Sequence, residues 1–432
     1  MMQAAQHGKE EPRAYSGLIA CHECDALHRT ESLPENSSAH CGRCDARLYR
    51  HIPAALERSL ALHLTALLLF IIANTFPFMS LKIGGRVETD ILLSGPMALI
   101  ELGMSDIGLL VLLTSIVFPL LVLLGSLYLL GCLRLGIEAP GLGSVFRMVQ
   151  HLRPWSLIGV FMLAVLIAIV KLLDMAQVEA GTSLFAFAAL LPVMTLAQQG
   201  FDRSLFWPQE AVGSESAWLP TGAAQQYGLA HCHTCALLVQ VSQGHCPRCG
   251  DHLHLRKPES LTRTWALLAS ATLLFFPANM LPIMTVTRFG QGEPSTILSG
   301  VEHLIAAGMW PLGLIVFFAS IVVPISKLVA LIFLLLSIQQ RSTWRPEDRT
   351  RLYRVTEVIG SWSMVDIFII ALLTSLVSFD ALATIRPGIA ASFFAGMVVL
   401  TMIAARSFDS RLIWDAMEQN AAEVGSMEQE HG

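Results

Sequence analysis

Eight of the nine cysteines fall into four C-x-x-C pairs, and these pairs form two groups along the chain. The pairs are separated by 16 residues in the first group and by 10 in the second. Two such pairs can place four thiolates about 2.3 Å from one ion, which is the ligand set of a structural zinc site. We therefore predict two structural zinc ions, held by Cys21, Cys24, Cys41 and Cys44 and by Cys232, Cys235, Cys246 and Cys249.

Other uses of these cysteines are less favoured. Haem attachment requires a histidine after the second cysteine of a pair, and Asp, Asp, Ala and Gly stand there instead. A rubredoxin-like iron site uses the same four thiolates, so iron, a redox dithiol or an empty site stays open beside zinc. Histidines recur beside the cysteines, which we attribute to duplication rather than to ligand exchange; they are His22, His233, His40 and His245.

The composition excludes a soluble protein. Apolar residues make up 54% of the 432-residue chain and charged residues only 14%, against about a quarter charged in soluble proteins. Long stretches such as 104–133 and 155–173 carry almost no charge, which predicts a multi-span helical membrane protein. The sequence has no basic tract with interleaved aromatic residues, so we expect no nucleic-acid partner.

The second half of the chain repeats the first. Leu-Ser-Gly at 93–95 recurs at 298–300, an offset of 205. Further on the offset becomes 207, where FDRSLFW at 201–207 matches FDSRLIW at 408–414. A register kept along so much of the chain indicates a duplicated unit, in which a cysteine module precedes a membrane module.

The apolar segments predict four membrane spans per copy, with short apolar loops after the first span of each. In the first copy the spans run near 59–78, 107–133, 155–177 and 183–199, and in the second near 264–284, 310–338, 360–379 and 388–406. The expected fold is an all-α polytopic membrane protein with two tandem four-helix modules, eight spans in all, each module preceded by a small four-cysteine zinc ribbon. The expected domains are 1–58 (tail and first ribbon), 59–207 (first membrane module), 208–263 (linker and second ribbon), 264–414 (second membrane module) and 415–432 (polar tail).

The distribution of Lys and Arg predicts the orientation. Two of the 28 basic residues lie within spans; of the rest, 22 fall on the side of the ribbons and termini and 4 on the other side. Five of the 22 are arginines in the connection 339–359. By the positive-inside rule, both termini and both ribbons are cytoplasmic.

Ionisable residues within spans are costly in lipid and are functional candidates by default. The candidates are Lys171, Asp174, Lys327 and Asp366, with the Thr401 hydroxyl as a weaker one that we expect to bond its own helix. Lys171 and Asp174 are three residues apart and share a helix face. Lys327 and Asp366 lie at similar depths on consecutive antiparallel spans, so an ion pair between them is geometrically feasible.

The two candidate lysines occur in one copy each. Lys327 corresponds to Val122, and Lys171 corresponds to Ser378. The shared fold therefore does not require these charges, and we predict one asymmetric polar site between the copies. Two alternatives stay open: the long stems snorkel to the interface, or the charged pairs only lock helices together.

No catalytic signature is present in the sequence. It has no G-x-x-x-x-G-K-[ST] loop, no G-x-S-x-G elbow and no H-E-x-x-H helix. We therefore do not expect an enzyme.

The order of these motifs closely resembles that of one family. Each four-cysteine ribbon is followed by a four-span module, in which an Asn-x-x-Pro sequence ends the first span (its exit) and a Leu-Ser-Gly loop follows. The exits are Asn74–Pro77 and Asn279–Pro282. The chain resembles the paraquat-inducible protein A family, and within it the type called lipophilic envelope-spanning tunnel protein A, over about residues 15–207 and 226–414. The resemblance implies a multi-pass inner-membrane subunit that exchanges phospholipid with a periplasm-spanning tunnel protein built from mammalian-cell-entry (MCE) domains, and so maintains the outer-membrane barrier.

Two functions of other classes fit the same residues. A metal- or redox-sensing membrane protein would transmit the state of the ribbons to the bundle, and it predicts reversible thiol chemistry at the eight cysteines. A secondary transporter for a small solute predicts gradient-dependent uptake into vesicles without any MCE partner.

Overall fold

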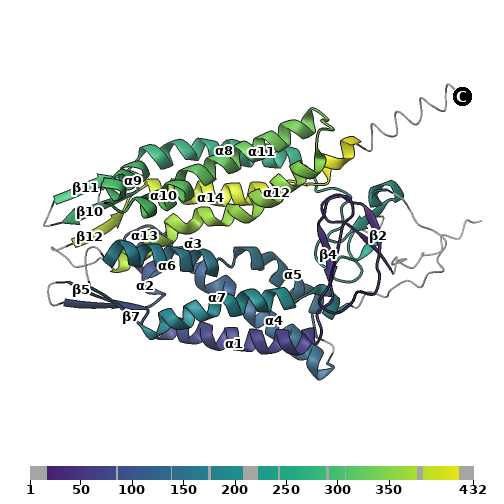
Figure 1. Ribbon diagram of the computed structural model, residues 1–432, viewed down its shortest axis with the longest axis horizontal. Helices are drawn as coiled ribbons and strands as arrows, with labels where there is room; N and C mark the ends of the chain where they lie inside the picture. Colours follow the sequence, from purple (N-terminus) through teal and green to yellow (C-terminus); the bar gives the residue numbers. More distant parts are fainter. Residues whose placement is uncertain are drawn as a thin grey trace, which may run out of the picture.

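The computed structural model describes residues 17–83, 86–137, 139–173, 177–207, 222–241, 244–288, 291–306, 308–376 and 383–417. Within these residues, eight helices are long and apolar enough to cross a membrane, as the sequence predicts. A helix satisfies its own backbone polar groups, which lipid cannot do. The helices form two sets of four, one from each copy of the repeat (Figure 1).

Both sets have the same order of elements. The first comprises α1 (Ala55–Thr75), α3 with α4 (Ser105–Leu112, Phe118–Leu135), α5 with α6 (Leu142–Leu152, Ile158–Leu173) and α7 (Thr182–Gly200). The second comprises α8 (Ser260–Met280), α10 with α11 (Trp310–Phe317, Val323–Gln339), α12 with α13 (Pro346–Gly360, Val365–Leu376) and α14 (Ala390–Ser407). A π-helical turn joins the two pieces of the second span in each half, at Leu113–Val117 and at Phe318–Val322. Pro119 and Pro324 each lie two residues beyond the end of these turns, so the wider backbone occurs where a proline interrupts the helix ladder.

Two three-stranded antiparallel sheets extend from one end of the bundle, which we call the sheet end (Figure 1). Their strand orders are β6-β5-β7 (Arg86–Asp90, Met79–Ile83, Gln177–Ala180) and β11-β10-β12 (Gln291–Ser295, Met284–Arg288, Ala383–Pro387). Short helices α2 (Ser94–Glu101) and α9 (Ile297–Ala306) follow the two hairpins. We predicted loops here, because strands of four or five residues are too short to give a readable period.

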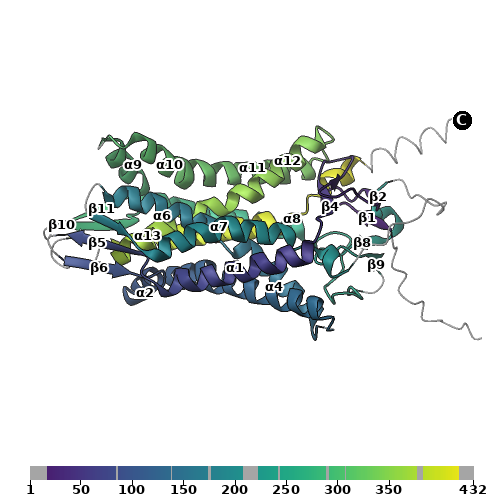
Figure 2. The ribbon, with the colours of Figure 1, turned by 60° about the horizontal axis from the view of Figure 1, so that its bottom comes forward.

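The cysteine modules lie at the opposite end, the ribbon end (Figures 1 and 2). The strands of the first ribbon are β1 (Leu18–Ala20), β2 (Leu27–Arg29), β3 (Ser38–His40) and β4 (Arg47–Arg50), and those of the second are β8 (Leu229–His231) and β9 (Leu238–Gln240). Four spans per half return the chain to the same end, so both ribbons share one face of the bundle, as predicted.

The helix that leads into the third span of each half begins before the predicted start of that span. We placed the starts near 155 and 360, but helix already runs from Leu142 and from Pro346. The segment 339–359, which we treated as a connection, is therefore mostly α12. Its charged residues hid the helix from a hydropathy reading, although Pro346 with two acidic residues in the first turn is a typical helix start.

The two halves meet along α6 and α13. The rings of Phe161 and Phe368, which correspond in the repeat, lie 5.2 Å apart at this contact. Helix α13 also packs against α2 and α3 of the first half, and nearly all of its side chains are buried. The core of the molecule therefore lies at the junction of the halves.

Candidate metal centres and intramembrane polar site

Each cysteine pair sits in a tight turn that the backbone repeats four times. The N–H group of the residue after the second cysteine donates to the carbonyl of the first cysteine over 2.8–2.9 Å. That residue has a left-handed backbone with φ between 59° and 74°, and the four such residues are Asp25, Asp45, Ala236 and Gly250. The turn brings both thiols of a pair to one point, as the spacing predicts.

The four sulfur atoms of each ribbon are buried and lie within 4.8 Å of one another. In the first ribbon, Cys21 Sγ lies 3.5 Å from Cys44 Sγ, and the second ribbon repeats this distance between Cys232 and Cys249. Four thiolates around a zinc ion at 2.3 Å lie about 3.8 Å apart in a tetrahedron. Each cluster therefore fits one tetrahedral metal ion, and zinc rather than iron stays our prediction.

The surroundings favour the charged form of two thiols in each cluster and the neutral form of the other two. His28 Nε2 lies 3.1 Å from Cys41 Sγ, which is the kind of outer contact that orients a metal ligand. Hydrogen bonds from Cys21 lower the pKa of Cys41, and those from Cys232 lower the pKa of Cys246. Hydrogen bonds from Cys21 raise the pKa of Cys24, and those from Cys232 raise the pKa of Cys235, so a metal ion that binds four thiolates must displace protons from each cluster.

The first ribbon docks on the membrane module of the second half. The Arg43 guanidinium lies 4.5 Å from the ring centre of Trp414, which follows the eighth span. From α12, Arg354 donates to the Cys44 carbonyl at 2.7 Å and pairs with Glu23 at 2.5 Å. The first four-cysteine site therefore rests on helices of the second copy.

The second ribbon makes the reciprocal arrangement. Its Arg248 guanidinium lies 5.8 Å from the ring centre of Trp207, which follows the fourth span. Gly143 of α5 packs so closely on Cys249 that an added Cβ would lie 2.9 Å from the Cys249 carbonyl oxygen. Each ribbon thus contacts the membrane module of the opposite copy. Corresponding residues make this contact in both copies, so the crossed arrangement is part of the repeat.

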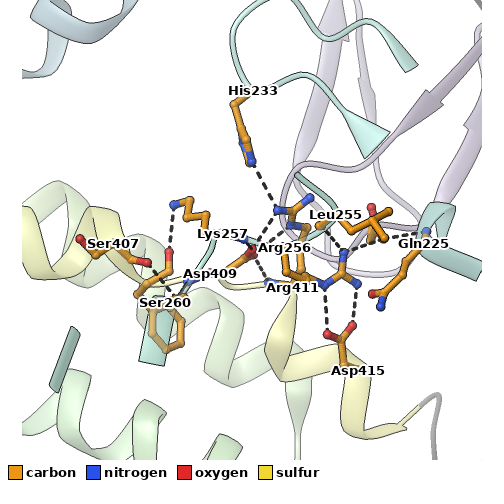
Figure 3. Close-up of polar contacts among 12 residues, drawn as sticks. Gln225, His233, Leu255, Arg256, Lys257, Ser260, Ser407, Asp409, Arg411 and Asp415 are labelled. Carbon is orange, nitrogen blue, oxygen red and sulfur yellow. Dashed lines mark hydrogen bonds and ion pairs between the residues drawn. The ribbon is translucent and has the colours of Figure 1, made fainter. Parts of the chain in front are cut away.

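A partly buried arginine joins the two ribbons to the segment that follows α14 (Figure 3). Arg256 donates to Asp25 of the first ribbon at 2.8 Å and forms a two-pronged ion pair with Asp415 at 2.6 and 3.0 Å. Asp25 also accepts the backbone N–H of Gln225 at 3.1 Å. We call this the Arg256 clasp.

A second buried ion pair holds the segment after α14 (Figure 3). Arg411 binds both carboxylate oxygens of Asp409 at 2.8 and 2.9 Å and lies 3.3 Å from His233 of the second ribbon. Asp409 also accepts the backbone N–H of Lys257 at 2.9 Å and donates its own N–H to Ser260 Oγ at 3.0 Å. Burial alone would raise the pKa of Asp409, but its bonds to Arg411 outweigh burial and hold that pKa well below its usual range.

Within the bundle, the structure brings together Lys327 of α11 and Thr401 of α14. The Lys327 ammonium is buried and donates to Thr401 Oγ1 at 3.2 Å. Thr401 Oγ1 also donates to the Val398 carbonyl of its own helix at 2.8 Å, as predicted. Gly360 makes room for the ammonium, because an added Cβ there would lie 2.6 Å from Lys327 Nζ.

The other intramembrane candidates are placed less fully. Asp366 is buried in the first turn of α13. Lys171 lies in α6, but its side chain is outside the described residues, and so is all of Asp174. The hydrogen bond that the structure gives Lys327 goes to Thr401, and its pairing with Asp366 stays a prediction.

Sequence reasoning missed the contacts that fix the ribbons. The Arg256 clasp joins residues more than 150 positions apart, and no local pattern marks it. The sequence did hold a signal for the Arg–Trp contacts between each ribbon and the opposite copy. Arg43 and Arg248 occupy the same position within their C-x-x-C pairs, and a tryptophan ends each of the repeated segments 201–207 and 408–414. We used these residues only as evidence of duplication.

Comparison with known proteins agrees with this architecture. A family model described as paraquat-inducible protein A matches residues 56–210 and 261–418, once in each half. The chain is 33% identical over 421 residues to lipophilic envelope-spanning tunnel protein A of Escherichia coli K12, covering 96% of this chain and 95% of the relative. It is 31% identical over 407 residues to intermembrane transport protein PqiA of the same strain, covering 94% and 97%.

A probable intermembrane transport protein of Haemophilus influenzae is 28% identical over 405 residues, covering 92% of this chain and 95% of the relative. No solved structure matches the chain. The family model covers both membrane modules, and the relatives cover nearly the whole chain. This multi-pass membrane protein therefore belongs to the paraquat-inducible protein A family.

Proposed function

We propose that this protein is the inner-membrane subunit of an intermembrane lipid transport system, with its ribbons and termini in the cytoplasm. Relatives named as intermembrane transport proteins and as an envelope-spanning tunnel protein support the transport role. The excess of basic residues at the ribbon end supports the orientation. The partner we propose is an MCE-domain tunnel protein that exchanges phospholipid with the bundle at the sheet end.

The buried contact between Lys327 and Thr401 carries this proposal. An ammonium group at membrane depth is costly, and only 4% of Lys327 is exposed. The first half fills the corresponding positions with Val122 and Met194, which are also buried. Since the same fold forms there without charge, the energetic cost of Lys327 points to a function rather than to packing.

We assign Lys327 and Thr401 to a polar site that responds to transport, with Asp366, Lys171 and Asp174 as its further members. Two chemical roles suit a buried lysine. It can hold a phospholipid headgroup by its positive charge, or it can release and regain a proton as the bundle changes shape. Arginine separates these roles, because a guanidinium keeps its charge at every physiological pH.

The test compares Lys327→Met and Lys327→Arg with the matched control Val122→Met. We expect Lys327→Met to assemble normally and to lose lipid transfer between donor and acceptor membranes, with a weakened outer-membrane barrier. Lys327→Arg should retain transfer if the site holds a headgroup and lose it if the site couples to protons. Full transfer by a normally assembled Lys327→Met variant would refute the assignment, and solute uptake without lipid transfer would favour a secondary transporter.

For the ribbons, we propose structural zinc. Four thiolates leave no open position on the ion, so the metal stabilises the ribbon instead of performing chemistry. Elemental analysis of the purified protein should give two zinc ions per chain, and serine at Cys44 should lose one of them. Iron in place of zinc, or reversible oxidation of the eight thiols in the metal-loaded protein, would favour the redox-sensing alternative.

A further inference from the structure

Three histidines share one exposed face of the second ribbon. His245 and His252 face each other across an antiparallel bridge, so their side chains emerge on the same side of the two strands. Leu253 is buried and His254 is exposed again, so His254 returns to the face of His252. None of the three belongs to the four-cysteine cluster.

The spacing of the rings is close to that of a metal chelate. The ring centres of His245 and His252 lie 4.3 Å apart, and those of His252 and His254 lie 6.1 Å apart. An ion bound to two imidazoles at about 2.1 Å lies about 3.2 Å from each ring centre, which puts the centres about 4.5–5.2 Å apart. The centres of the first two rings therefore lie within about 1 Å of the chelate spacing, and rotation of the exposed side chains is needed to aim their nitrogens at one ion and to bring in the third ring.

The first ribbon lacks this face although it has the same hairpin. His40 corresponds to His245 and pairs across β3 and β4 with Arg47, where the second ribbon has His252. Tyr49 stands where the second ribbon has His254. Duplication alone would leave one histidine, so the other two belong to the second copy.

We propose that His245, His252 and His254 form a labile binding site for a divalent transition-metal ion of the zinc, nickel and copper class. Imidazole is the ligand that these ions share, and carboxylate-preferring Mg²⁺ and Ca²⁺ are not expected to bind. Two or three imidazoles leave coordination positions to water, so the ion exchanges, unlike one enclosed by four thiolates. His245 directly precedes Cys246, so the labile ion lies beside the enclosed one and is placed to replace it when it is lost.

The test uses the full-length, untagged protein with both ribbons loaded with zinc, titrated with Ni²⁺ by calorimetry. We expect one further ion to bind at micromolar concentration, and His252→Ala to weaken that binding about tenfold or more because it breaks the chelate. His40→Ala is the matched control in the first ribbon and should leave Ni²⁺ binding unchanged. Elemental analysis before titration must show that each variant keeps its two tightly bound ions.

The electron paramagnetic resonance spectrum of the Cu²⁺-loaded protein gives an independent readout. It should show at least two coordinated nitrogens in the wild type and fewer in the His252→Ala variant. Three results would overturn the proposal: no further ion bound below millimolar Ni²⁺, equal affinity in His252→Ala and wild type, or loss of binding in His40→Ala instead. If His252→Ala loses a tightly bound ion, His254→Ala provides the same comparison from a residue further from the cysteines.

Discussion

The two halves share a fold but differ in how they pack at their junction. In the first half, Gly95 of α2 lies against α13, and an added Cβ would be 3.2 Å from the Ala371 carbonyl oxygen. The corresponding Gly300 of α9 has no atom within 4 Å of such a Cβ. The seventh span is thus enclosed by the first half, whereas its counterpart, the third span, is less buried.

This difference teaches which features a duplicated unit keeps. Features fixed by backbone geometry occur in both halves: the cysteine turns, the π-helical turns and the sheets. The Arg–Trp contacts of the two ribbons are side-chain contacts that both halves also keep. Three other side-chain features have diverged: the Lys327–Thr401 contact, the Arg256 clasp and the junction of α2 with α13. We infer that the shared features specify the fold, whereas the divergent features give the two halves different functions.

The largest expected effect tests the shared geometry. Gly181 and Gly388 each pass so close to the end of the first span that an added Cβ would lie 2.1 Å from the carbonyl oxygen of Pro77 or of Pro282. Backbone cannot move aside as a side chain can, so alanine at either glycine should cost about 3 kcal/mol, the upper end for overpacking. Thermal unfolding in detergent should show similar losses for both variants, and a loss in only one half would contradict the equivalence.

Next in size is the Arg256 clasp, which only one copy possesses. Arg256→Met leaves Asp25 buried without its cation, and we expect a cost of about 2–3 kcal/mol, because Arg256 retains some solvent contact. The corresponding residue of the first ribbon is the exposed His51, so His51→Met should leave the melting temperature unchanged. Zinc content is measured in parallel, and an Arg256→Met variant that melts like the wild type would show that the clasp contributes no stability.

The sequence predicted those parts of the fold that follow a local pattern. Eight apolar runs gave the spans, and C-x-x-C spacing gave the ligands, because hydropathy and turn geometry depend on near neighbours. The helices α5 and α12, which lead into the third spans, were missed, since their polar and charged residues lower the hydropathy of these segments. The hairpins β5–β6 and β10–β11 were missed because their strands are too short to give a readable period, and β7 was missed because it joins β5 across almost 100 residues, which leaves no local mark.

The candidate site was predictable only in part for the same reason. Hydropathy singled out Lys327 and Asp366 as costly, and the repeat showed that Lys327 is not needed for the fold. Depth along a helix does not determine which neighbour a side chain faces, however. The structure pairs Lys327 of the sixth span with Thr401 of the eighth span, and not with the span that directly follows.

A smaller effect tests the junction of the halves directly. Gly95→Val places methyl groups against the backbone of α13, and we expect a cost of about 1–2 kcal/mol from forced separation of the packed helices. Gly300→Val meets open space and should be neutral or stabilise by a few tenths of a kcal/mol, since valine is a better helix former than glycine by about that amount. Melting temperatures of the two variants give the comparison, and equal losses would mean that the halves pack alike in the membrane.

The smallest expected effect concerns an exposed ion pair that occurs in the first half only. It tests whether such a pair contributes to stability simply because the other half lacks it. Arg134 at the end of α4 pairs with Glu57 at 3.6 Å, and the second half has Gln339 and Thr262 at the corresponding positions. Both side chains are more than half exposed, so water and salt screen the pair, and Arg134→Gln should change stability by about 0.5 kcal/mol or less. A melting temperature that falls as far as in Arg256→Met would mean that asymmetry itself, rather than burial, determines which charges this protein depends on.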